Sequence, residues 1–152
     1  MHFITSDELT KYIDSFIHQD TQQHEDHFDL TVSSISVLTQ KGALDFGGSE
    51  FEAAQEETII PQKRNDDDDY GWWELSEGMY NAVMNEELNT SKQAAPLLSL
   101  HPHARKAGLI ANTSIIKNNS ANKRIEITFK VPKSGCSIKE NARLATLYLL
   151  AD

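Results

Sequence analysis

The chain has 152 residues, 39% of them hydrophobic and 24% charged, which predicts a single globular domain over residues 1–152. Its net charge of −9 argues against a general nucleic-acid binder, since such proteins neutralise phosphates with a basic surface. The single cysteine, Cys136, excludes an internal disulfide and a cysteine-based zinc site within one chain.

The apolar runs are too short to cross a membrane, which takes about 20 residues, and the first residues lack the basic and apolar regions of a signal peptide. We therefore expect a cytoplasmic protein with no membrane partner. Charge is distributed unevenly, because residues 1–87 hold 20 of the 23 acidic residues and residues 88–152 hold 10 of the 14 basic ones. This asymmetry favours a small anionic ligand bound by the C-terminal part, or acidic and basic surfaces that meet within or between subunits.

The first predicted element is a short amphipathic helix from about Ile4 to His18. Thr5 and Glu8 have the spacing of a capping box at its start. The apolar residues at helical spacing, which we expect to pack into the core, are Leu9, Tyr12, Ile13, Phe16 and Ile17.

Two histidines, His24 and His27, lie in the polar segment from Asp20 to His27 that follows this helix. They stand beside Glu25 and Asp26 and could bind a metal adventitiously. Their spacing matches no recognised ligand pattern, so no metal site is predicted.

Alternating apolar and polar residues from Phe28 to Ser33 predict a half-buried strand. The alternation resumes in a new phase through Leu38, which predicts a bulge near Ser33 and Ser34. Three further segments follow: short strands and tight turns around Ala43 to Phe46, an edge strand from Thr58 to Pro61, and a solvated loop from Gln62 to Tyr70.

The segments Trp72 to Leu75 and Met79 to Met84 predict two strands, paired as a hairpin. Neighbouring strand residues point to opposite faces, so one tryptophan is expected in the core and the other at a partner surface or over a ligand ring. A polar loop is expected from Asn85 to Gln93.

The C-terminal part predicts strands at Ser114 to Ile116, Arg124 to Val131 and Leu144 to Leu150. A polar loop from Lys117 to Lys123 and a turn from Pro132 to Gly135 separate them. One helix followed by many short strands indicates an all-β barrel or sandwich, mainly β with one N-terminal helix.

The stretch from Leu97 to Leu109 combines a buried-looking strand with a cationic turn and a closing glycine. The turn holds His101, Pro102, His103, Arg105 and Lys106. Arginine and lysine on a constrained backbone suit the phosphates of a nucleotide. The alternative is a surface turn whose cations are solvated or paired with acidic neighbours.

Several motifs, in order, resemble those of the dUTPase and dCTP deaminase superfamily, and the dCTP deaminase branch in particular. They are the Phe28-Asp29-Leu30 strand, the Tyr70 to Gly78 segment, the Pro102 to Leu109 turn and the Lys139 to Leu147 segment, KENARLATL. The resemblance implies a β-clip fold, a dUTPase-like distorted barrel. It further implies a homotrimer with active sites between subunits, and dCTP or dUTP as the ligand.

The same resemblance assigns roles to individual residues. Arg105 and Lys106 would hold phosphates, and His101 or His103 would contact the ligand or a neighbouring subunit. Asn112 and Thr113 begin the segment that stands in place of the nucleotide-gripping hairpin and are the remaining candidate substrate contacts. The strand glutamate of the deaminases aligns with Thr128, so Glu126, two residues away on the same face, is the candidate general base.

Three functions follow from these observations. The first is a divergent dCTP deaminase-like or dUTP diphosphatase-like enzyme, with magnesium possible through the nucleotide phosphates and no other cofactor expected. The second is a catalytically inactive β-clip protein with a nucleotide-binding, regulatory or structural role. The third, metal-dependent hydrolysis through His101 and His103, lacks a third ligand, and the zinc deaminase signature is absent.

Overall fold

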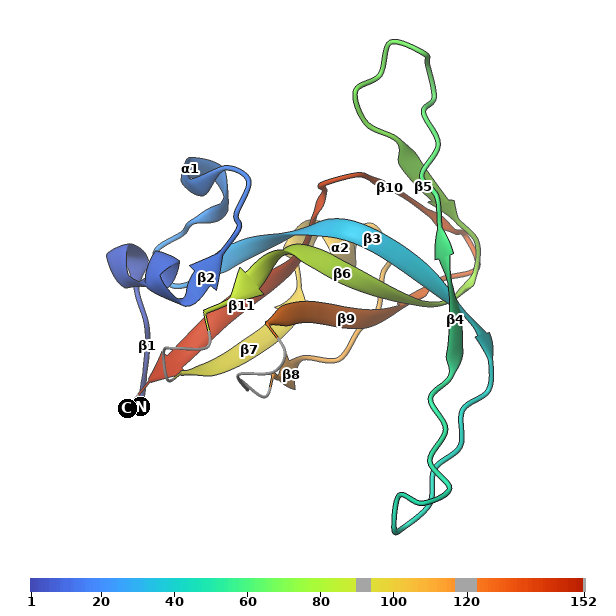
Figure 1. Ribbon diagram of the computed structural model, residues 1–152. Coiled ribbons are helices and arrows are strands. Elements are labelled where there is room, and N and C mark those ends of the chain that lie inside the picture. Colours follow the sequence, from blue (N-terminus) through green and yellow to red (C-terminus); the bar gives the residue numbers. More distant parts are fainter. Residues whose placement is uncertain (90–93, 117–122, 152) are drawn as a thin grey trace.

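A computed structural model describes residues 1–89, 94–116 and 123–151. Strands dominate it, which confirms the all-β prediction (Figure 1). The strands are β1 (His2–Phe3), β2 (Ile13–Asp14), β3 (Phe28–Gln40), β4 (Gln55–Ile59), β5 (Trp72–Leu75), β6 (Gly78–Leu88), β7 (Ala95–Leu100), β8 (Ser114–Ile115), β9 (Arg124–Val131), β10 (Cys136–Lys139) and β11 (Arg143–Ala151). The helices are a 3-10 helix η1 (Ser6–Tyr12) and two short α-helices, α1 (Gln19–Gln22) and α2 (Pro102–Lys106).

Among the described residues, nine strands form one antiparallel sheet, and β5 and β10 form a second, two-stranded sheet. The order β2-β6-β3-β11-β7-β8 runs through the large sheet, with β1 on β11, β4 on β3 and β9 on β6. The hairpin of β3 and β4 extends away from the main body, and the two ends of the chain lie together (Figure 1).

The core lies on the inward faces of the long strands. Burial alternates along β9, where Ile125, Ile127, Phe129 and Val131 are buried and the residues between them are exposed. Strand β3 changes its pairing register with β6 between Val32 and Ser34, which confirms the predicted bulge. In the part of the chain that the structure describes, no helix is long and apolar enough to span a bilayer.

The predicted N-terminal helix is wrong in type and length. Only Ser6–Tyr12 is helical, as a 3-10 helix, and Thr5 makes no side-chain capping bond. Ile13 and Asp14 are extended instead and pair with Leu88 and Glu87 of β6. Sheet pairing and burial of Leu9 and Ile13 therefore outweigh the local helical pattern.

Trp72 to Leu75 and Met79 to Met84 are strands, as predicted, but they do not form a hairpin. Strand β6 pairs with β3 on one side and β9 on the other, so both of its edges are taken. Strand β5 pairs with β10 instead.

Two further predictions, one of a loop and one of short strands, also differ from the structure. The predicted loop from Asn85 is strand as far as Leu88, and residues 90–93 of it lie outside the described residues. Ala43 to Phe46 holds a single bridge, between Ala43 and Glu52, rather than strands. Most of the predicted Lys117 to Lys123 loop also lies outside the described residues.

Candidate functional site

The cationic turn after β7 is a short helix, α2, rather than an irregular turn. His101 precedes it, and its Nδ1 atom accepts a hydrogen bond from the backbone N–H of His103 at 3.0 Å. Pro102 follows at the first helical position, where its missing N–H costs nothing. The sequence PHARK therefore forms one turn of helix directly after the strand.

The four candidate residues of this segment have different surroundings. His101 is buried, whereas His103, Arg105 and Lys106 are exposed. The rings of His101 and His103 lie edge to face, 4.8 Å apart between centroids. His103 borders a hollow between α2, β10 and β11, but Arg105 and Lys106 line neither this hollow nor a second one over β9.

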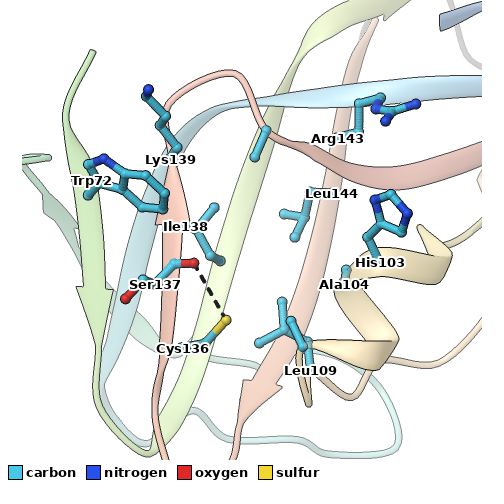
Figure 2. Close-up of a pocket in the computed structure, with 12 residues that line it drawn as sticks. Trp72, His103, Ala104, Leu109, Cys136, Ser137, Ile138, Lys139, Arg143 and Leu144 are labelled. Atoms are coloured by element: carbon cyan, nitrogen blue, oxygen red, sulfur yellow. Dashed lines mark hydrogen bonds between the residues drawn. The ribbon is translucent and has the colours of Figure 1, made fainter. Parts of the chain in front are cut away.

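The first hollow has a volume of about 240 Å³ and lies between α2, β10 and the start of β11. Figure 2 shows Trp72 and Lys139 on one side of it and His103 and Arg143 on the other, with Ile138 and Leu144 between them. Its lining is mostly apolar. Burial raises the pKa of the Cys136 thiol, with Glu74 adding to the rise, so this lining residue is not an activated nucleophile.

The two adjacent tryptophans point to opposite faces, as the sequence predicts. Trp73 is buried and its Nε1–H donates to the Ile59 carbonyl at 2.9 Å. Trp72 borders the first hollow, and the Arg64 guanidinium lies 3.7 Å from its ring centroid.

The second hollow has a volume of about 510 Å³ and lies over the outer face of β9. Glu126 and Thr128 line it from this strand, and Asn112 lines it from the segment after α2. Met79 and Ile110 add apolar surface to it. Its volume is within the range of small-molecule sites, and the hollow is open to solvent.

Glu126 is half exposed, and one of its oxygens lies 3.1 Å from the Arg124 guanidinium. The Thr128 hydroxyl donates to the Asn81 side-chain oxygen at 3.3 Å. Of the predicted site residues, the structure brings Glu126 and Asn112 into one hollow and His101 next to His103. Thr113 is exposed beside Asn112 and does not line the hollow.

A third group of polar residues, centred on Asp29, was not predicted as a unit. Asp29 is 1% exposed, and its Oδ2 atom lies 3.1 Å from Arg143 Nη1, 3.0 Å from His24 Nε2 and 3.4 Å from His101 Nε2. Burial lowers the pKa of His101, while the Asp29 carboxylate opposes that shift. The only sequence signal was an aspartate inside an apolar strand and an arginine in KENARLATL, two of the motifs that carry the resemblance.

Comparison with known proteins gives relatives over nearly the whole chain, although no protein-family model matches it. A probable deoxyuridine 5'-triphosphate nucleotidohydrolase of Methanococcoides burtonii is 24% identical over 89% of this chain and 76% of its own length. Proteins of the same description from Methanosarcina mazei and Methanosarcina acetivorans are 24% and 25% identical, over 97% of this chain and 86% of their lengths.

The fold is similar to that of a solved structure, the 2'-deoxycytidine 5'-triphosphate deaminase of Agrobacterium tumefaciens. The TM-score is 0.60 at 10% identity over 95% of this chain, which spans 45% of that deaminase's length. Together the relatives and the fold support a relationship of the chain to the dUTPase and dCTP deaminase superfamily.

Proposed function

We propose that this relative of the dUTPases and dCTP deaminases is a cytoplasmic enzyme of nucleotide metabolism that binds a pyrimidine deoxynucleoside triphosphate. The observation that carries the proposal is the match to proteins described as deoxyuridine triphosphate nucleotidohydrolases along 89% to 97% of the chain. Those descriptions favour hydrolysis of dUTP to dUMP and diphosphate. Deamination of dCTP to dUTP and ammonia is the alternative reaction on the same fold.

The proposal places the nucleotide in the hollow over β9. Asn112 offers both a donor and an acceptor for a pyrimidine edge, and Glu126 is the carboxylate in the same hollow. Glu126 would take a proton from water as that water attacks the α-phosphorus of dUTP, with diphosphate leaving, or C4 of dCTP, with ammonia leaving. Magnesium would enter as part of the substrate, bound to its phosphates.

The phosphates are assigned to Arg105 and Lys106, which requires a second subunit. Both cations are exposed on α2, and neither lines the hollow of its own chain. Met79 and Ile110, which line that hollow, are 42% and 61% exposed, and Ile115, which follows the lining residue Ser114, is 67% exposed. Exposed apolar side chains of this kind suit a contact between subunits. We therefore propose a homotrimer in which a neighbouring chain brings its cations to the nucleotide.

A second candidate function is nucleotide binding without turnover. The Arg124 guanidinium already contacts one Glu126 oxygen, and a threonine, Thr128, stands where the resemblance expects the deaminase glutamate. Both features favour a regulatory or structural protein of the same fold.

Incubation of the whole chain with magnesium and either dUTP or dCTP tests the proposal, with diphosphate and ammonia as the measured products. We expect Glu126→Gln to lower kcat by about 100-fold or more while nucleotide binding is retained. Glu56→Gln, an exposed glutamate on β4, is the matched control and should keep full activity. Replacing Arg105 and Lys106 together by alanine should weaken binding by about 10- to 100-fold.

The outcomes of this experiment separate the candidates. Binding measured by calorimetry without either product selects the second function. Absence of both binding and products with either nucleotide contradicts the proposal as a whole.

A further inference from the structure

Three potential metal ligands meet at the start of β3. One ring nitrogen each of His24 and His27 and a carboxylate oxygen of Asp29 all lie within 4.8 Å of one another. His24 Nε2 is 3.0 Å from Asp29 Oδ2, and His27 Nε2 is 3.8 Å from Asp29 Oδ1. Ligands of a tetrahedral zinc ion are roughly 3.3 Å apart when each bond is about 2.0–2.1 Å long. The His24 and His27 rings lie stacked, 4.4 Å apart between centroids, so binding an ion requires the two rings to rotate out of this stack.

The Asp29 carboxylate presents one oxygen that the protein leaves without a hydrogen bond. The side chain is 1% exposed, and among the described residues Oδ1 has no hydrogen-bond partner, whereas Oδ2 lies 3.1 Å from Arg143 Nη1 and 3.0 Å from His24 Nε2. A buried carboxylate oxygen without a partner is costly, because it has lost water and gained nothing in exchange. Oδ1 faces His27, so a cation bound between them would satisfy it.

Two of the three ligands, His27 and Asp29, also have polar partners behind them. His27 Nδ1 lies 2.6 Å from Asp26 Oδ1, which fixes the ring and leaves Nε2 directed at Asp29. A carboxylate behind a histidine is the usual outer partner of a metal-bound imidazole. His101 holds Oδ2 from the other side: its Nδ1 accepts a hydrogen bond, so in the neutral ring Nε2 carries the proton, 3.4 Å from Oδ2.

The ligands are also accessible to an ion in solution. The side chains of His24 and His27 are 38% and 26% exposed. A hollow of about 410 Å³, lined by α1 residues and His24, opens beside the cluster.

We propose that His24 Nε2, His27 Nε2 and Asp29 Oδ1 bind one divalent transition-metal ion of the zinc type. Two imidazoles and one carboxylate suit zinc, cobalt or iron(II) rather than magnesium or calcium, which prefer oxygen ligands. The site joins the segment after α1 to the sheet, and it does not rest on the proposed nucleotide chemistry.

Metal titration of the whole chain, stripped of metal by a chelator, tests this inference. Zinc affinity is measured by competition with a coloured chelator, and cobalt(II) is followed by its visible absorption. We expect one equivalent to bind. His27→Gln should weaken binding by on the order of 100-fold and Asp26→Asn by about 10- to 100-fold, since loss of an outer partner has effects of this size.

His2→Gln is the matched control, because His2 is an exposed histidine on β1, outside the cluster. It should bind metal as the unchanged chain does. Zinc should also raise the Tm of the unchanged chain and of the control but not that of His27→Gln.

Three results would overturn the inference. They are no binding at micromolar zinc, a cobalt spectrum identical to that of cobalt in buffer, and equal binding by His27→Gln and His2→Gln. The cobalt spectrum of the unchanged chain decides the matter even if a variant fails to fold.

Discussion

Gly108, which closes the cationic segment, has a backbone conformation that side-chain-bearing residues rarely adopt. Its φ is +94°, and a Cβ atom there would lie 3.3 Å from Pro132 Cγ. This backbone conformation at Gly108 turns the chain after α2, so that Leu109 is buried in the core and Ile110 pairs with Lys130 of β9. Gly108 thus sets the path of the chain from α2 to Ile110, which lines the hollow over β9.

We expect Gly108→Ala to lower the free energy of unfolding by about 1–2 kcal/mol, because positive φ strains an L-residue. Gly47→Ala is the control, since its nearest contact would be 3.9 Å away and its φ is not positive. Urea denaturation of both variants measures the difference. Equal stabilities for the two variants would contradict the assignment of strain to Gly108.

At the scale of elements, one glutamate joins β6 to β3 and α1. Glu86 is 0% exposed and accepts hydrogen bonds from the Thr31 backbone N–H at 2.8 Å, the Thr31 hydroxyl at 2.6 Å and the Gln22 amide at 2.6 Å. Burial raises the pKa of Glu86, and the hydrogen bonds from Thr31 and Gln22 offset part of the rise. The strand continues through this position because the carboxylate has partners on both neighbouring elements.

The raised pKa of Glu86 predicts how stability depends on pH. The folded chain holds the Glu86 proton more tightly than the unfolded chain. The contribution of Glu86 to the free energy of unfolding is therefore largest below the unfolded pKa of 4.5 and is lost as pH rises through the folded pKa. We therefore expect the difference in the free energy of unfolding between the unchanged chain and Glu86→Gln to fall as pH is raised from 4 towards 7.

Chemical denaturation at a series of pH values measures this difference. Glu87→Gln, on the opposite face of β6, controls for the loss of one negative charge. A difference that rises with pH would show that the hydrogen bonds outweigh burial at Glu86.

At the level of assembly, the proposed function requires a neighbouring chain to complete the site. The hollow over β9 holds the carboxylate, and the two cations assigned to phosphate lie outside it on α2. Ile115, on β8, is 67% exposed and follows Ser114, which lines this hollow. Assembly and nucleotide binding should therefore depend on the same surface.

We expect the unchanged chain to have about three times the mass of the 17.1 kDa monomer in solution. Ile115→Glu should lower that mass and weaken nucleotide binding, because a charge cannot be buried unpaired in an apolar contact. Leu44→Glu, 89% exposed near the end of the β3–β4 hairpin, should change neither. Sedimentation and calorimetry give the two readouts, and a monomer that binds nucleotide fully would contradict the assembly.

Local patterns in the sequence determined the mainly β class, the alternating strand β9 and the bulge in β3, because side-chain alternation reflects which face of a strand is buried. The ordered motifs also indicated the superfamily. Only the tertiary structure decided that β5 pairs with β10, that Ile13 is extended, and that Arg143 reaches Asp29 across 114 residues. The same is true of which candidate residues share a hollow. Contacts between distant strands depend on which strand edges remain unpaired and on the space left between strands, and a local sequence pattern contains neither kind of information.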